Sequence, residues 1–213
     1  MVLIQTTVGL PTSAANAATP SLRAEPTGAL VDVPGHLKYT EITRVGKMFS
    51  ASTLNTGVTI ASLTLTTSAP TALGNPTGSG VNAFLKSISM VYVSGTIGTG
   101  AMFLVSHANS AAVTGTAATY INNALVGNTA VPACNATYTS TVAASGKVLL
   151  NLWTTEPFLA TDHLAPGQQM IYEFDGCFGV MPGSAVSIQG ITAAGSSPLA
   201  VFTWVWEEVT IAV

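Results

Sequence analysis

Two acidic residues in the last third of the chain are the first candidates for chemistry. Glu173 and Asp175 are two positions apart, with Asp162 and His163 a short distance upstream. Residues i and i+2 of a β-strand share one face, so the two carboxylates could bind Ca²⁺ or act as acid and base in glycoside hydrolysis. The alternative is a solvated strand end that runs into the turn Asp175-Gly176, and we favour this alternative.

The other reactive residue types form no catalytic or metal-binding pattern. The histidines, His36, His107 and His163, are far apart, and the chain has no HxH, HxxxH or CxxC spacing. The glycine-rich segments 78–80 and 95–100 open no helix after a strand, so they are predicted turns rather than phosphate sites. No GxSxG surrounds a serine. We therefore expect no enzymatic activity, no metal and no cofactor.

The end of the chain concentrates aromatic and acidic side chains in one predicted strand. Within residues 199–211, Trp204 and Trp206 share a face with Phe202, which predicts a place in the core or at a subunit interface. Glu208 shares that face and is a carboxylate in need of a partner, which a neighbouring subunit could supply. The two cysteines, Cys134 and Cys177, are expected to be free thiols rather than a disulfide, because a β-domain of this length has core enough without one.

The composition is poor in charge. Only 7% of the 213 residues are Asp, Glu, Lys or Arg, whereas 48% are hydrophobic; an average soluble domain has about 25% charged residues. The surface must therefore consist of hydroxyl, small and apolar groups. Exposed apolar patches of this kind mark interaction sites. A net charge of −3 gives no basic footprint for nucleic acid, and the apolar runs are shorter than the ~18–20 residues of a membrane-spanning helix. We also expect no secretory signal, because no Lys or Arg precedes the Ala-rich stretch near residue 15.

Most of the chain reads as β-strands separated by small-residue turns. In the run 83–93, Phe84, Ile88, Met90 and Tyr92 share one parity, with Lys86 as the exception. Asp175-Gly176 predicts a hairpin. The strongest further strand patterns cover residues 101–105, 147–153, 184–188 and 199–211, and the range 164–174 reads as a Pro-Gly turn followed by a strand. Weaker strand patterns lie at 118–121 and 137–142. Without a convincing helix, this pattern predicts an all-β protein, an antiparallel β-sandwich or jelly roll.

The first 50 residues differ from the rest. They hold 7 of the 15 formally charged residues (6 basic and 9 acidic) and only short β-like pieces, at 28–33, 37–41 and 45–49. We predict an extended N-terminal arm over residues 1–50 and a β-sandwich domain over residues 51–213. The arm is interpreted either as a segment that docks onto a polar partner or as a solvated β-ribbon. The candidate partner-binding residues are Arg23, Glu25, Lys38, Arg44, Lys47, Trp204, Trp206 and Glu208.

Three stretches resemble small structural proteins of tailed bacteriophages. They are the opening LRAEPTGALV at 22–31, the segment GNPTGSGVNAFLKSISMVYVSGT at 74–96, and the closing SPLAVFTWVWEEV at 197–209. The resemblance implies a virion component that decorates or cements a capsid, or that forms fibres or spikes, commonly as a trimer of a β-sandwich with an extended arm.

Three functions follow as hypotheses. The first is a homotrimeric decoration or cement protein that bridges neighbouring subunits of the major capsid protein, assembled in the host cytoplasm and located in the virion. The second is a tail fibre, spike or head-fibre protein that binds a host glycan. The third is a glycan-active enzyme that uses Glu173 and Asp175.

Overall fold

The computed structural model describes residues 39–60, 66–96, 100–109, 113–118, 120–142, 146–155, 169–192 and 197–211. The chain divides into two compact units, Met1–Glu41 and Ile42–Val213. The first unit is described only from residue 39, so the predicted strand pieces before that residue lie outside the described ranges. The fold reported below is that of the second unit.

The described chain is almost entirely β-structure. Its elements are α1 (Thr40–Arg44), β1 (Met48–Ser52), β2 (Val58–Thr59), β3 (Ser68–Gly74), β4 (Val81–Ser94), β5 (Gly100–His107), β6 (Thr114–Ala117), β7 (Tyr120–Asn123), β8 (Asn135–Thr141), β9 (Lys147–Thr155), β10 (Gln169–Glu173), β11 (Gly179–Val180), β12 (Ala185–Thr192) and β13 (Leu199–Thr210). In these ranges no helix is long and apolar enough to cross a membrane.

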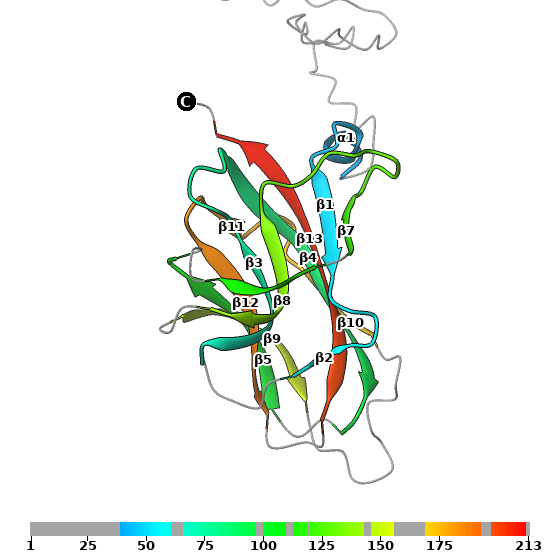
Figure 1. Ribbon diagram of the computed structural model, residues 1–213, viewed down its shortest axis with the longest axis vertical. Coiled ribbons are helices and arrows are strands. Elements are labelled where there is room, and N and C mark those ends of the chain that lie inside the picture. The colour runs from blue at the N-terminus through cyan, green and yellow to red at the C-terminus, as the bar shows by residue number, and fades with distance from the viewer. Residues whose placement is uncertain are drawn as a thin grey trace, which may run out of the picture. The chain divides into compact units, whose positions relative to one another are not determined.

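The strands form two antiparallel sheets (Figure 1). The seven-stranded sheet has the order β10-β4-β13-β1-β7, with β11 also paired to β4 and β2 to β13. The six-stranded sheet has the order β6-β8-β3-β12-β5-β9. The side chains between the sheets form one hydrophobic cluster, so the prediction of an all-β sandwich is confirmed.

The strand order is that of a jelly roll. The pairs β1·β13 and β4·β10 lie in the seven-stranded sheet, whereas β3·β12 and β5·β9 lie in the six-stranded sheet. Early strands therefore pair with late strands in nested order, and successive pairs alternate between the sheets, as when a long double ribbon is rolled up. Strands β6, β7 and β8 belong to an insertion between β5 and β9 and extend both sheets at their edges.

β13 supplies the centre of the core. Its side chains alternate between half-buried and buried along most of its length, because successive residues of a strand face opposite sides of the sheet. Phe202, Trp204 and Trp206 all face inward and are at most 1% exposed. The indole N–H of Trp204 donates a hydrogen bond of 2.9 Å to Thr71 Oγ1 on β3, which links the two sheets.

A β-bulge at Lys86 changes the face of β4 that enters the core. Before the bulge Leu85 is buried, and after it Ile88 is buried, and the pairing with β13 shifts register at this point. The expectation that Phe84 shares one face of the strand with Ile88, Met90 and Tyr92 is therefore wrong for Phe84, which lies before the bulge. The bulge lets the strand keep its apolar residues inside while Lys86 points outward, where its Nζ lies 2.7 Å from Glu207 Oε2.

The hairpin predicted at Asp175-Gly176 is also wrong, although the turn is present. Both residues have positive φ, 53° and 81°, and the Cys177 N–H donates to Phe174 O at 2.9 Å across the turn. The flanking strands β10 and β11 do not pair with each other, because each pairs with a different part of β4. The Gly176 N–H donates to Leu85 O, so the turn interrupts the edge strand beside the bulge of β4.

The predicted strand piece at 37–41 is replaced at its end by the helix α1. This short helix ends at Arg44, and it is capped by Gly46, whose φ of 68° is left-handed. The Gly46 N–H donates to Thr43 O and the Lys47 N–H to Ile42 O, which is a Schellman C-cap. β1 then begins at Met48 inside the seven-stranded sheet, so the expected domain boundary after residue 50 falls within a strand.

Candidate interaction surface

The acidic residues singled out for chemistry lie on the surface. Glu173 ends the edge strand β10, Asp175 lies in the turn that follows, and both are exposed. Asp162 and His163 lie outside the described residues. Within the described ranges, no group of three or more His, Cys, Asp or Glu side chains is placed to hold a metal ion.

The partner of Glu208 belongs to the same chain. Glu208 is 4% exposed, and its carboxylate accepts hydrogen bonds from Ala133 N (2.9 Å), Cys134 N (2.9 Å) and Trp206 Nε1 (3.2 Å). Trp204 and Trp206 lie in the core, which is one of the two places predicted for them. The partner that Glu208 was expected to find on a neighbouring subunit is supplied by the described chain itself. The three side chains are therefore buried and not exposed for contact with a partner. They face the space between the sheets, where the described chain itself satisfies the carboxylate.

The two cysteines are free, as expected, and their environments differ. Cys134 is buried and Cys177 is exposed. Burial raises the pKa of the Cys134 thiol well above its usual range, and the neighbouring Glu208 carboxylate raises it further by Coulomb repulsion and a hydrogen bond. The Cys134 thiol therefore stays protonated and unreactive in the folded protein.

The remaining predicted partner-binding residues divide between described and undescribed parts of the chain. Arg44 and Lys47 are exposed at the corner between α1 and β1. Arg23, Glu25 and Lys38 lie outside the described residues. The corner thus places two cations at the end of the sandwich where β1 begins and β13 finishes.

We call this end of the sandwich the α1 end; it consists of residues 44–48, 75–80, 121–134, 181–184 and 207–211. Backbone hydrogen bonds connect its segments: Glu208 N donates to Lys47 O, and Ile211 N donates to Gly80 O. Of the ten exposed large apolar residues in the described ranges, seven lie here: Val45, Leu125, Val126, Val131, Met181, Val209 and Ile211. The other three lie on the edge strands β9 and β10.

The segment 124–134, between β7 and β8, is held at both ends. At its start, the Ala124 N–H donates to Met48 O at 2.8 Å, and the Asn123 side chain donates to Gly46 O and accepts from Leu125 N. At its end, the two backbone bonds to Glu208 fix residues 133 and 134. The exposed residues between these anchors therefore lie on a loop whose two ends are fixed by hydrogen bonds.

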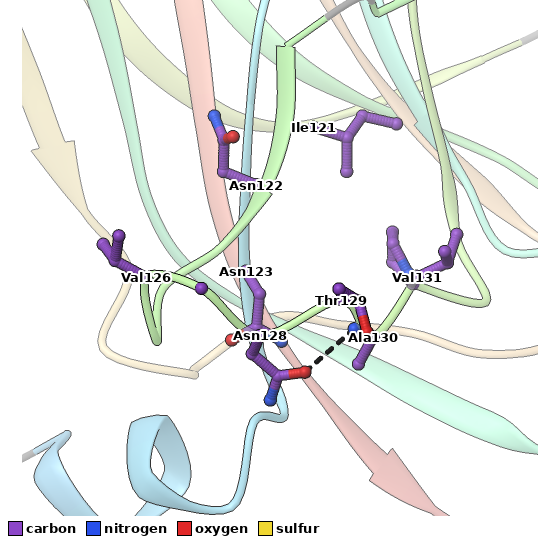
Figure 2. Close-up of a pocket in the computed structure, with 10 residues that line it drawn as sticks. Ile121, Asn122, Asn123, Val126, Asn128, Thr129, Ala130 and Val131 are labelled. Carbon is purple, nitrogen blue, oxygen red and sulfur yellow. Dashed lines mark hydrogen bonds between the residues drawn. The ribbon is translucent and has the colours of Figure 1, made fainter.

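This segment and the end of β7 also line an open pocket of about 310 Å³. Figure 2 shows its lining side chains, with Val126 and Val131 on opposite sides of the loop. The lining residues are Ile121, Asn122, Asn123, Val126, Gly127, Asn128, Thr129, Ala130, Val131 and Pro132. None of them carries a charge, and the whole stretch 87–146 contains no Asp, Glu, Lys or Arg.

Sequence reasoning missed the 124–134 loop. A signal was present, because Leu125, Val126 and Val131 lie in a polar, small-residue region and do not alternate as the apolar residues of a strand do. Apolar residues without an alternating pattern can be exposed in a loop or can belong to a weak strand, and the sequence alone does not separate these two cases. Only the fold shows that they lie next to the α1–β1 corner.

The strand order defines a jelly-roll β-sandwich, and seven of the exposed large apolar residues in the described ranges lie at its α1 end. No protein-family model matches the chain, and no curated protein matches it. Among solved structures the chain is similar to a chain of the "KBV activated particle at acidic pH", with 13% sequence identity over 97% of this chain and 86% of that chain, and a TM-score of 0.26. A TM-score of this size does not establish a shared fold, so the jelly-roll assignment rests on the strand order.

Proposed function

We propose that this chain is a structural protein of a virion and acts as a decoration or cement protein that bridges neighbouring subunits of a phage capsid. The observation that carries the proposal is the α1 end, a braced surface with seven exposed large apolar residues. Proteins that work by binding present rigid apolar patches with a polar rim. Jelly rolls occur in viral capsid and lectin domains and in cupins, so the fold is compatible with the proposal without deciding it.

Cement action requires only buried area. An interface of ~1,600 Å² has a gross hydrophobic term of tens of kcal/mol at ~25 cal/mol per Å², before the cost of ordering is subtracted. Repetition over a shell multiplies a small net gain per subunit. We propose a homotrimer that contacts the major capsid protein, with Arg44 and Lys47 facing acidic groups at the rim of that contact.

The test is binding of the full chain to tailed-phage heads that lack it. We expect saturable co-sedimentation, hundreds of copies per head, and heads that resist heat or chelation better when they are loaded. Heads that bind no protein, or whose resistance is unchanged at saturation, would contradict the proposal.

One observation favours the second function, a fibre or spike protein that binds a host glycan. The pocket at 121–132 is lined by three asparagines and a threonine, and amide and hydroxyl groups suit a sugar. A few copies per particle, located at a vertex, together with specific signals on a glycan array, would support this function in place of cement. A glycan-active enzyme would lose hydrolysis in Glu173→Gln/Asp175→Asn, whereas we expect that variant to assemble as the wild type does.

A further inference from the structure

The outer face of the six-stranded sheet is covered by part of the chain. In a sandwich of two antiparallel sheets this face commonly meets solvent, yet Ala72 on β3 and Val105 on β5 are 0% exposed. Val142 packs against Ala69 and Ala72 in a small apolar cluster, together with the half-buried Val113. Residues just before β6 and just after β8 therefore form a thin outer layer on this sheet.

A histidine is buried between this outer layer and the sheet. His107, the last residue of β5, is 3% exposed, and its Nε2 lies 2.8 Å from the hydroxyl oxygen of the buried Ser187 on β12. Gly146, which follows Val142 in the same connection, lies so close to the ring that a methyl group on its Cα would be 2.6 Å from His107 Cε1. The imidazole is therefore in contact with both the sheet and the outer layer.

The elements packed around His107 carry almost no charge. In β5, β9, β12 and the described part of the outer layer, the one formally charged side chain is that of Lys147, at the start of β9, and it is exposed. No Asp or Glu occurs anywhere in residues 42–155 or in β12. A proton on the imidazole would therefore be a buried positive charge, and the other charge on these elements has the same sign. Burial away from water disfavours the charged form of such a group.

The outer layer is held more weakly than the core between the sheets. Its buried apolar residues are two alanines and a valine, whereas the core contains the large aromatic side chains of β13. On the same face, Gln189 is 2% exposed; its Nε2 donates to Thr66 O at 3.0 Å, and its Oε1 accepts no hydrogen bond from the described chain. A buried carbonyl oxygen without a donor is destabilising, and regions with few buried apolar contacts open first. We therefore expect the outer layer to open before the sandwich unfolds.

We propose that His107 is an acid-sensitive switch: protonation of its imidazole at mildly acidic pH separates Val142 and Gly146 from the six-stranded sheet. The ring reaches water once the outer layer has moved, and there it holds its proton as a free histidine does, with an ordinary pKa of about 6.5. In the closed form the ring stays neutral, so the stability of the closed form is fully present above about pH 6.5 and decreases as the pH falls below that value. The switch is a property of the β-sandwich and does not rest on the proposed function.

The first experiment follows the protonation of His107 in the full chain by NMR, from the chemical shift of its assigned Cε1–H signal between pH 8 and pH 5. A free histidine is half protonated at about pH 6.5. The ring of His107 should still be neutral at that pH, because it is buried without a compensating charge on the strands around it. A ring that is half protonated at pH 6.5 would overturn the inference, since the buried site would then tolerate the charge.

The second experiment locates the opening by hydrogen exchange at pH 7.5 and pH 5.5, corrected for the intrinsic dependence of exchange on pH. In the outer layer the Val142 amide donates to Thr67 O at 2.7 Å, and in the seven-stranded sheet the Phe202 amide donates to Thr53 Oγ1 at 3.0 Å. When the pH falls, the wild type should lose about tenfold of its protection at Val142 and none at Phe202.

Two substitutions with glutamine separate His107 from the other titrating groups. In His107→Gln the protection of Val142 should be the same at both pH values, because no imidazole remains there to be protonated. The matched control His36→Gln makes the same substitution outside the described residues and should respond to acid as the wild type does. Gly146→Ala places a methyl group against the ring and should lower the protection of Val142 already at pH 7.5.

Three results of the exchange experiment would overturn the inference. They are a protection of Val142 that does not depend on pH in the wild type, a loss that is equally large in His107→Gln, and an equal loss at Val142 and Phe202, which would mean that the whole domain unfolds. If His107→Gln does not fold, the NMR titration of the wild type decides the question by itself.

Discussion

The buried Glu208 carboxylate allows the sharpest test of the structure, through the substitution Glu208→Gln. Oε1 accepts two of its hydrogen bonds and Oε2 accepts the third, from Ala133 N. Glutamine keeps one oxygen, so its amide N–H₂ must face a backbone N–H. Hydrogen bonds to a charged group contribute about 1.5–3 kcal/mol each and neutral ones about 0.5–1.5 kcal/mol. Losing one bond and weakening two, offset in part by the easier burial of a neutral amide, should lower the free energy of unfolding by about 2–4 kcal/mol.

The assay is urea unfolding followed by tryptophan fluorescence, because Trp204 and Trp206 are buried beside this site. The matched control is Glu173→Gln, the same substitution at an exposed carboxylate on an edge strand, with an expected change within about 0.5 kcal/mol. Hydrogen exchange gives the location of the effect, since the amides of Ala133 and Cys134 should exchange faster in Glu208→Gln. A Glu208→Gln protein as stable as the control variant would refute the assignment of Glu208 as the anchor of the 124–134 loop.

Four further predictions follow from other parts of the chain. At pH 8 iodoacetamide should label Cys177 and leave Cys134 unlabelled until urea unfolds the protein, as mass spectrometry would show; labelling of both in the native state would contradict the burial of Cys134. In the folded protein the raised thiol pKa keeps Cys134 protonated, whereas in the unfolded chain the thiol ionises near its ordinary value of about 8.5. The contribution of Cys134 to the free energy of unfolding should therefore be fully present below about pH 8.5 and should decrease above it. The variant Cys134→Ala should not show that decrease. Trp204→Phe loses the hydrogen bond to Thr71 and leaves a cavity. The free energy of unfolding, measured in urea, should therefore fall by about 2–4 kcal/mol, and a fall of less than about 1 kcal/mol would argue against the packing described. Deletion of residues 1–38 leaves β1 complete, so the circular dichroism spectrum should be preserved. If the arm binds the capsid, the same deletion should abolish co-sedimentation with phage heads. Undiminished binding would show that the arm has no part in the proposed function.

The fold class could be predicted from the sequence because local signals carry it. The strand period of β13, the Pro182-Gly183 turn before β12 and the run that becomes β9 all have the pattern of the elements they form. The placement of strands in two sheets could not be predicted this way. β4 and β5 are neighbours in the sequence and belong to different sheets, and no residue near their connection encodes that separation.

The failures share one physical cause, which is that an isolated strand does not reveal its partner. Lys86 breaks the period of β4, but only the pairing with β13 shows that a bulge restores the core face after it. Asp175-Gly176 has the residues of a hairpin turn, yet β4 is long enough to pair with both flanking strands. The inward direction of Glu208 could be predicted from its place on the strand, whereas two of its three hydrogen-bond donors are backbone N–H groups more than 70 residues away.

The nested pairing of the jelly roll has a consequence for how this protein is made. Met48 at the start of β1 pairs with Glu207 near the end of β13, and the two tryptophans that fill the core lie on that last strand. A nascent chain on the ribosome cannot close its core until β13 has emerged, and contacts so distant in sequence make folding slow. Translation that stops before β13 therefore releases an unfolded chain rather than a shortened domain, which restricts assembly to full-length copies.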